Sequence, residues 1–134
     1  MSKLNLDKAL AAIDINAEWV GLREVKEATT YRVIRDGNPQ ANSRKIDHGV
    51  MIEVLADGQF GYYGCSNLSH ENIQKAAEKA LRQAKAAAKN PIYKFTENAR
   101  PVTVGSFQSS FKKSVDEISA SRLNEIMLKA YNQI

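Results

Sequence analysis

The sequence predicts an α+β fold, namely a two-layer domain in which a mostly antiparallel sheet of about four strands carries helices packed on one face. Residues 50–65 alternate between two kinds of side chain around a central Asp57-Gly58 pair. Residues 69–89 carry apolar side chains at helical spacing, and further extended segments come earlier in the chain. Strands joined by tight turns and accompanied by helices are typical of this fold class. We expect the 134 residues to form a single domain.

The hairpin over residues 50–65 is the strongest local prediction. Its first strand places Val50, Ile52, Val54 and Ala56 on one face and Met51, Glu53 and Leu55 on the other. Asp57 and Gly58 can adopt the positive φ values of a two-residue turn, so residues 59–65 form the return strand. We expect the Val50 face to meet the core. Gly61 and Gly64 indicate a bulge or a close approach by another element.

The longest predicted helix covers residues 69–89. Ser69 is suited to the N-cap because its hydroxyl can accept a hydrogen bond from a free amide of the first turn. An apolar stripe follows, made up of Ile73, Ala76, Ala77, Ala80, Leu81, Ala84 and Ala88. Since the stripe is mostly alanine, it predicts close packing against the sheet. We expect Asn90, in a left-handed conformation, and Pro91 to end the helix.

The rest of the chain is predicted as shorter elements. A helix over residues 4–15 has Asn5 as its N-cap, and strands follow over 17–27, 29–36 and 40–47. The last of these strands is polar, which suits a sheet edge. Residues 101–107 fit either a short strand or an extended arm. A final helix begins at a capping box formed by Ser114 and Glu117 and continues to Ile134.

The composition is that of a soluble globular protein, with 43% hydrophobic and 25% charged residues. No apolar run is long enough to cross a membrane. The N-terminal segment lacks the apolar core of a signal peptide, from which we expect a cytoplasmic protein. Cys65 is the only cysteine, and its place in an apolar strand favours an unreactive packed thiol.

The net charge of +4 is mild, and part of it lies on the longest helix. Five cations lie away from its apolar stripe: Lys75, Lys79, Arg82, Lys85 and Lys89. Such a set could meet phosphates, but it is more typical of a solvated helix face. No aromatic residues are interleaved with these cations to stack on bases, so the pattern does not favour nucleic-acid binding.

Neither histidine, His48 or His70, completes a catalytic or metal-binding motif. His70 and Glu71 resemble the first half of a zinc-protease motif, in which a second histidine lies four residues after the first. That position is occupied by Gln74. No phosphate-binding loop and no nucleophile elbow is present. We therefore assign no catalytic residue, metal ligand or cofactor to this chain.

The central stretch resembles the N-terminal domain of the TldD/PmbA family, also called the modulator of DNA gyrase family. The residues that carry the similarity are Gly49 and Val50, the D-G-x-x-G turn at Asp57, Gly58 and Gly61, the segment Ser66, Asn67, Leu68 and Ser69, and Ala80, Ala84 and Lys85 in the helix. Residues 17–37 resemble the first two strands of the family, and residues 114–134 resemble a later helix. Glu53 is a departure, since members often carry a basic residue there.

This resemblance implies that the chain is the non-catalytic N-terminal domain of a longer, cytoplasmic zinc metallopeptidase. Such an enzyme acts in pairs of subunits, as a homodimer or a heterodimer, on extended peptides. Its zinc is expected in the portion that follows this domain, because this sequence has no positions that match the zinc motif. The domain would contribute subunit contacts and shape access to the active site.

Two other functions remain open. A free-standing protein-interaction module would bind a partner through Trp19, Phe60, Tyr62 and Tyr63, because aromatic residues often anchor interfaces. A gyrase-linked or nucleic-acid-binding regulator would instead use the lysine-rich helix face, and its DNA binding would weaken with salt.

Overall fold

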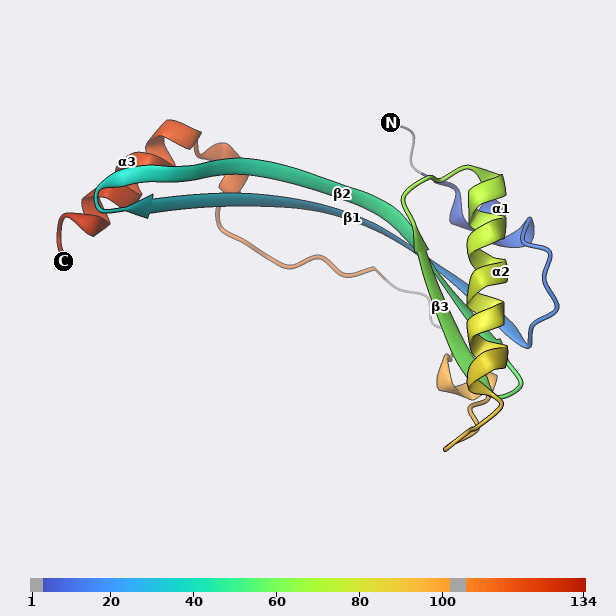
Figure 1. The fold of residues 1–134 in the computed structure, drawn as a ribbon. Helices are drawn as coiled ribbons and strands as arrows, with labels where there is room; N and C mark the ends of the chain where they lie inside the picture. The colour runs from blue at the N-terminus through green and yellow to red at the C-terminus, as the bar shows by residue number, and fades with distance from the viewer. Residues whose placement is uncertain (1–3, 102–105) are drawn as a thin grey trace. The chain divides into compact units, whose positions relative to one another are not determined.

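The computed structural model describes residues 4–101 and 106–134 and confirms the α+β class (Figure 1). The elements are α1 (Leu6–Ala11), β1 (Trp19–Arg35), β2 (Asn38–Ala56), β3 (Gln59–Cys65), α2 (His70–Ala87) and α3 (Ala120–Tyr131), with short 3₁₀ turns at Glu97–Ala99 and Val115–Glu117. The strands form one sheet in the order β1-β2-β3. The strand or arm expected over residues 101–107 falls mostly outside the described residues.

The sheet has three strands, so the prediction of about four was wrong. The segments 17–27 and 29–36 merge into β1, and the segments 40–47 and 50–56 merge into β2. Only Ala28 separates the first pair, and it has no tendency to form a turn. Asp57 and Gly58 have the expected positive φ values, 52° and 73°. Asp36 and Gly37, between β1 and β2, have similar values of 51° and 72°.

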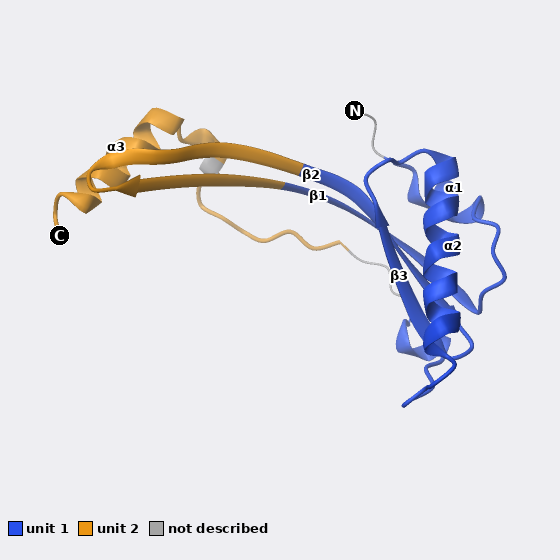
Figure 2. Ribbon diagram, in the orientation of Figure 1, with its two compact units in different colours: residues 1–27, 47–102 blue, residues 28–46, 103–134 orange. Residues whose placement is uncertain are grey.

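The chain divides into two compact units, which Figure 2 shows in two colours. Unit 1 consists of Met1–Glu27 and Asp47–Val102, and unit 2 of Ala28–Ile46 and Thr103–Ile134. The strands β1 and β2 contribute residues to both units. The single-domain interpretation stays a prediction.

Unit 1 contains the hydrophobic core, on the predicted face of β2. Its centre consists of Val50, Ile52 and Val54 from β2 and Ala76, Ala77 and Ala80 from α2. Gly61 of β3 faces the same way, because it pairs directly with Val54. A Cβ atom at Gly61 would lie 2.0 Å from the Ala80 carbonyl oxygen and 2.7 Å from the Ala84 amide nitrogen. The alanine stripe and this glycine therefore let the α2 backbone pack directly on β3.

The ends of α2 follow the prediction in part. Ser69 is the N-cap, and its side chain accepts from the Asn72 amide. The helix ends at Ala87 with Ala88 as the C-cap, and the Asn90 amide donates to the Ala87 carbonyl oxygen. The prediction that Asn90 adopts a left-handed conformation was wrong. A tightened last turn already satisfies the Ala87 carbonyl oxygen, so no left-handed residue is needed there.

Side chains of α2 also hold the segment after α1. The Gln74 amide group accepts from the Asp14 amide at 3.0 Å and donates to the Asp14 carbonyl oxygen at 2.8 Å. His70 Nε2 lies 3.0 Å from the Ala12 carbonyl oxygen. Asn5 is the N-cap of α1 as predicted, but the helix ends at Ala11 instead of residue 15. Residues after Ala11 bond to α2, which replaces a further helical turn.

Unit 2 contains the distal parts of β1 and β2 and the helix α3. Ser119 is the N-cap of α3, so the predicted start at Ser114 was wrong. Ser114 instead directly precedes the 3₁₀ turn at Val115–Glu117, and its hydroxyl accepts a hydrogen bond from the Asp116 amide. The helix ends at Tyr131 and does not continue to Ile134. No helix in the part of the chain that the structure describes is long and apolar enough to span a membrane.

Candidate functional site

The face of the sheet opposite α2 carries an aromatic surface in unit 1. Leu55 pairs with Phe60 and Glu53 pairs with Tyr62, and directly paired residues share a face. The Trp19 ring meets Phe60 edge-on, with the ring centroids 6.2 Å apart. A Cβ atom at Gly21 would lie 2.3 Å from the Trp19 ring, so this glycine provides the space in which the ring lies. We call Trp19, Glu53, Phe60 and Tyr62 the docking face.

The docking face is covered by residues 92–100, which we call the strap. The Phe95 amide donates to the Gly58 carbonyl oxygen at 2.9 Å, and the Gln59 side chain donates to the Tyr93 carbonyl oxygen. The Phe95 ring centroid lies 5.4 Å from that of Phe60 and 4.9 Å from that of Tyr93. The strap thus extends the aromatic cluster and packs against the hairpin turn.

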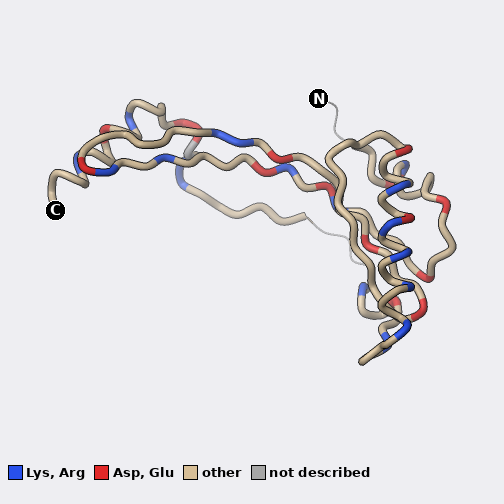
Figure 3. The backbone as a smooth tube through the Cα atoms, in the orientation of Figure 1, with Lys and Arg blue, Asp and Glu red and all other residues tan. Residues whose placement is uncertain are grey.

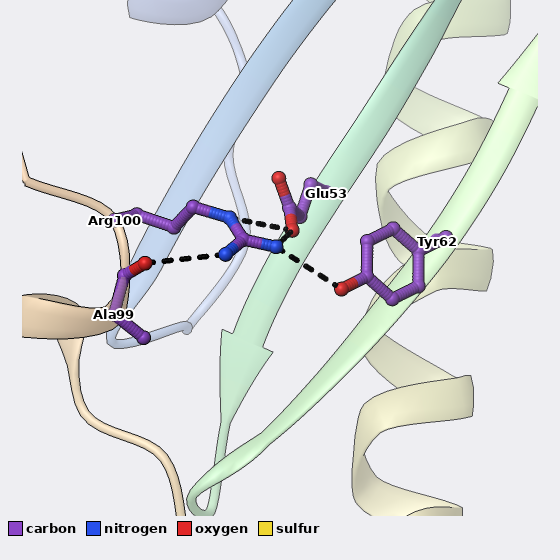
Figure 4. Close-up of polar contacts among 4 residues, drawn as sticks. All are labelled: Glu53, Tyr62, Ala99 and Arg100. Atoms are coloured by element: carbon purple, nitrogen blue, oxygen red, sulfur yellow. Dashed lines mark hydrogen bonds and ion pairs between the residues drawn. The ribbon is translucent and has the colours of Figure 1, made fainter.

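The strap ends in an arginine that joins both strands of the hairpin (Figure 4). Arg100 Nη2 and Nε lie 2.6 and 3.0 Å from Glu53 Oε1, and Nη2 lies 3.5 Å from the Tyr62 hydroxyl. Its guanidinium carbon also lies 4.8 Å from the Phe60 ring centroid. The hydrogen bond to Glu53 raises the pKa of Arg100. Desolvation, with Glu53 alongside, raises the pKa of Tyr62.

Leu55 lies on the face opposite the core, as expected from the strand alternation. That face is also covered, since Leu55 is 0% exposed. It lies next to Phe60 on the face that the aromatic residues and the strap occupy. The sheet of unit 1 is therefore covered on both faces near the hairpin turn, because a segment distant in sequence packs on the second face.

Three of the four predicted contact residues gather at this surface. Trp19 and Phe60 are half-buried, and Tyr62 is 44% exposed. Tyr63 lies on the α2 side, because it pairs with the core residue Ile52. Lys79 Nζ donates to the Tyr63 hydroxyl at 3.0 Å and lies 4.6 Å from the ring centroid. The structure thus separates Tyr63 from the other three.

The sequence reasoning missed the strap residues Tyr93, Phe95 and Arg100. The Tyr-x-Phe spacing after Pro91 is the one signal that could have indicated an extended segment with an aromatic face. Arg100 gave no such signal, because its partner Glu53 lies 47 residues earlier.

The histidines and the cysteine lie apart from the docking face. His48 Nε2 and Glu24 Oε1 lie 2.8 Å apart, and the two side chains are only 14% and 12% exposed. His48 and Cys65 both line a cavity of about 410 Å³ in unit 1. Desolvation raises the pKa of the Cys65 thiol, which disfavours the thiolate. Among the described residues, no three histidine, cysteine, aspartate or glutamate side chains lie close enough to hold a metal ion.

In the first half of α2 the lysines Lys75 and Lys79 alternate with Glu71 and Glu78, whereas Arg82 and Lys85 follow with no acidic residue between them. Figure 3 shows both signs of charge along the helix. Lys75 pairs with Glu71 at 2.5 Å, and Lys79 contacts Tyr63. Both lysines therefore have partners within unit 1.

The fold and this surface define a small α+β domain in which a β-hairpin packs on one long helix and carries an aromatic surface on its other face. Residues 20–84 match the family model described as PmbA/TldA metallopeptidase domain 1. Over these residues the chain is therefore similar to the first domain of the TldD/PmbA family. The match extends from β1 into α2 and ends before the strap. A comparison with curated proteins gives no significant match.

Proposed function

We propose that this chain acts as the non-catalytic N-terminal domain of a cytoplasmic TldD/PmbA-type zinc metallopeptidase that processes or degrades extended peptides. The match of residues 20–84 to the first domain of this family carries the proposal. The domain would contribute contacts to another subunit of the family, in a homodimer or heterodimer, and would shape access to the active site.

The described residues do not fit a zinc site. Zinc sites in proteins use three or four histidine, cysteine or carboxylate ligands, and no such group is present in residues 4–101 and 106–134. The proposal therefore assigns zinc to another part of the protein and gives no residue of this chain a step in peptide cleavage.

Zinc analysis and a peptidase assay test this proposal. We expect the purified 134-residue chain to retain no stoichiometric zinc after dialysis and to leave a fluorogenic peptide library uncleaved. Reading the gene past the codon for Ile134 should reveal an in-frame zinc motif, and that longer product should bind zinc and cleave peptides. Chelator-sensitive cleavage by the 134-residue chain itself would overturn the non-catalytic role.

A protein-interaction module is the second candidate function. It is favoured by Tyr62 and Tyr63, which are 44% and 39% exposed on opposite faces of β3. A complex between this chain and a protein partner bound through these tyrosines should survive zinc chelation. Tyr62→Ala or Tyr63→Ala should lower the affinity of that complex, as measured by sedimentation. Equal affinity of both variants and the wild type would exclude these tyrosines as anchors.

A further inference from the structure

The docking face has a well-defined occupant in this structure, and that occupant is the strap. Several contacts hold it, and three of them use different kinds of chemistry. The Phe95 amide donates to the Gly58 carbonyl oxygen, the Phe95 ring packs near Phe60, and the Arg100 guanidinium binds Glu53. The docking face and the neighbouring Gly58 carbonyl oxygen therefore bind a main-chain donor, an aromatic ring and a cation of one extended segment.

These anchors lie at the surface, which limits how strongly they hold the strap. Tyr93 is 66% and Phe95 38% exposed, and the side chains of Arg100 and Glu53 are 43% and 20% exposed. Ion pairs at such exposure contribute little to stability. The strap also lacks strand pairing, and its regular structure is one 3₁₀ turn at Glu97–Ala99. Segments with few buried contacts open at low free energy compared with core strands.

We propose that the docking face is a peptide-binding surface and that the strap occupies it in cis, exchanging with an extended segment of another polypeptide. The matching ligand carries an aromatic residue and an arginine five positions later, as Phe95 and Arg100 do. This inference rests on the second candidate function, the protein-interaction module, and names the class of peptide that the module would bind. It requires no zinc, so its failure would leave the proposed peptidase role unaffected.

A synthetic peptide of residues 91–100, PIYKFTENAR, which contains the strap and is labelled at its N-terminus, provides the probe. The double variant Phe95→Ala/Arg100→Ala opens the strap in the full chain. Phe107→Ala/Arg122→Ala is the matched control, because it removes the same side-chain types from unit 2, where Phe107 is 91% exposed and Arg122 pairs with Glu125. Fluorescence anisotropy measures peptide binding, and the emission of Trp19, the only tryptophan, reports on the docking face.

We expect the opened variant to bind the peptide at least about tenfold more tightly than the wild type or the control, because a tethered segment competes at high effective concentration. Replacing the phenylalanine and arginine of the peptide with alanine should abolish this gain. Trp19 emission should shift to the red in the opened variant and return when the peptide binds. Equal binding by all three proteins, or no binding by a folded opened variant, would overturn the proposal.

Two further measurements test the proposal. Glu53→Gln should weaken peptide binding to the opened chain but leave peptide binding to the closed chain nearly unchanged, because the substitution weakens the competing strap as much as it weakens the peptide. Hydrogen exchange on the wild type should be much faster at the Phe95 amide than at the Ile52 amide. A strap as protected as β2, or a dimer formed by exchange of straps between two copies of this chain, would overturn the assignment to a separate peptide.

Discussion

Units 1 and 2 share the strands β1 and β2, but their side chains differ sharply in burial. In unit 1, Ile52, Val54 and Ala77 are 0% exposed. In unit 2, none of the residues whose burial the structure describes is buried, and Tyr31 and Ile46 are each 59% exposed. The helix α3 likewise contains no buried residue, whereas α2 contains five.

The difference shows what a β-ribbon needs in order to have a core. A two-stranded ribbon is marginal in water, and a third strand or a helix must cover it. The residues of β2 from Val50 onward pair with β3, and α2 packs against that pair. The unit 2 part of β2 is polar from Gln40 to Lys45, apart from Ala41, and Ile46 alone adds no comparable apolar face. Stability should therefore be concentrated in unit 1.

The largest expected effect comes from truncating a core residue. Ile52→Ala should lower the free energy of unfolding by about 4 kcal/mol, because it leaves a cavity at a site that is 0% exposed. The same change in unit 2, Ile46→Ala, should cost less than about 0.5 kcal/mol, since that side chain is 59% exposed. Urea unfolding followed by circular dichroism measures both. Similar losses for the two variants would contradict the comparison.

A smaller loss should follow when a methyl group is added between α2 and β3. Gly61→Ala should cost about 3 kcal/mol, because the new Cβ atom would overlap the backbone at Ala80 and Ala84. Gly64→Ala is the control, since its Cβ atom would lie no closer than 3.8 Å to its nearest neighbour, Met51 Cε. Thermal unfolding should separate the two variants clearly. An unchanged midpoint for Gly61→Ala would mean that α2 can move away from the sheet at little cost.

Removal of a helix N-cap provides a further test, with an expected loss of stability of about 1 kcal/mol in unit 1. Ser69→Ala removes the cap of α2 and should lower global stability by about that amount, because unfolding of α2 exposes the core. Ser119→Ala removes the cap of α3 and should reduce helix content with little effect on the global midpoint, since α3 has no buried residue. Helix content and the unfolding midpoint are read from the same circular dichroism melt. A shift in midpoint with Ser119→Ala would show that α3 unfolds together with the core.

The smallest effect is expected from an exposed ion pair and depends on pH. Hydrogen bonding to Lys75 lowers the pKa of Glu71. Because the folded pKa lies below the unfolded one, this contribution is present at neutral pH and is lost as the pH falls through the lowered value. Glu71→Gln should thus shift the melting temperature slightly at pH 7 and leave it unchanged at acid pH. Glu125→Gln, which breaks the Arg122 pair in α3, should shift the global midpoint at neither pH.

The sequence by itself determined the local features of this protein. The Asp57-Gly58 turn, the Ser69 cap and the alanine stripe of α2 were predictable because each depends on residues within a few positions of one another. The likeness to the TldD/PmbA family was also readable, since the motif residues from Gly49 to Lys85 lie in one stretch. Its first domain is the one that residues 20–84 match.

Only the tertiary structure decided how the second face of the sheet is used. Leu55 is buried and Glu53 is paired because the strap returns to the hairpin, and Phe95 and Arg100 lie some forty residues further along the chain. Ser119 and not Ser114 caps α3, although both serines suit a cap locally. Local patterns specify turns and helices, whereas contacts between distant segments depend on how the whole chain closes on itself, which no short stretch of sequence encodes.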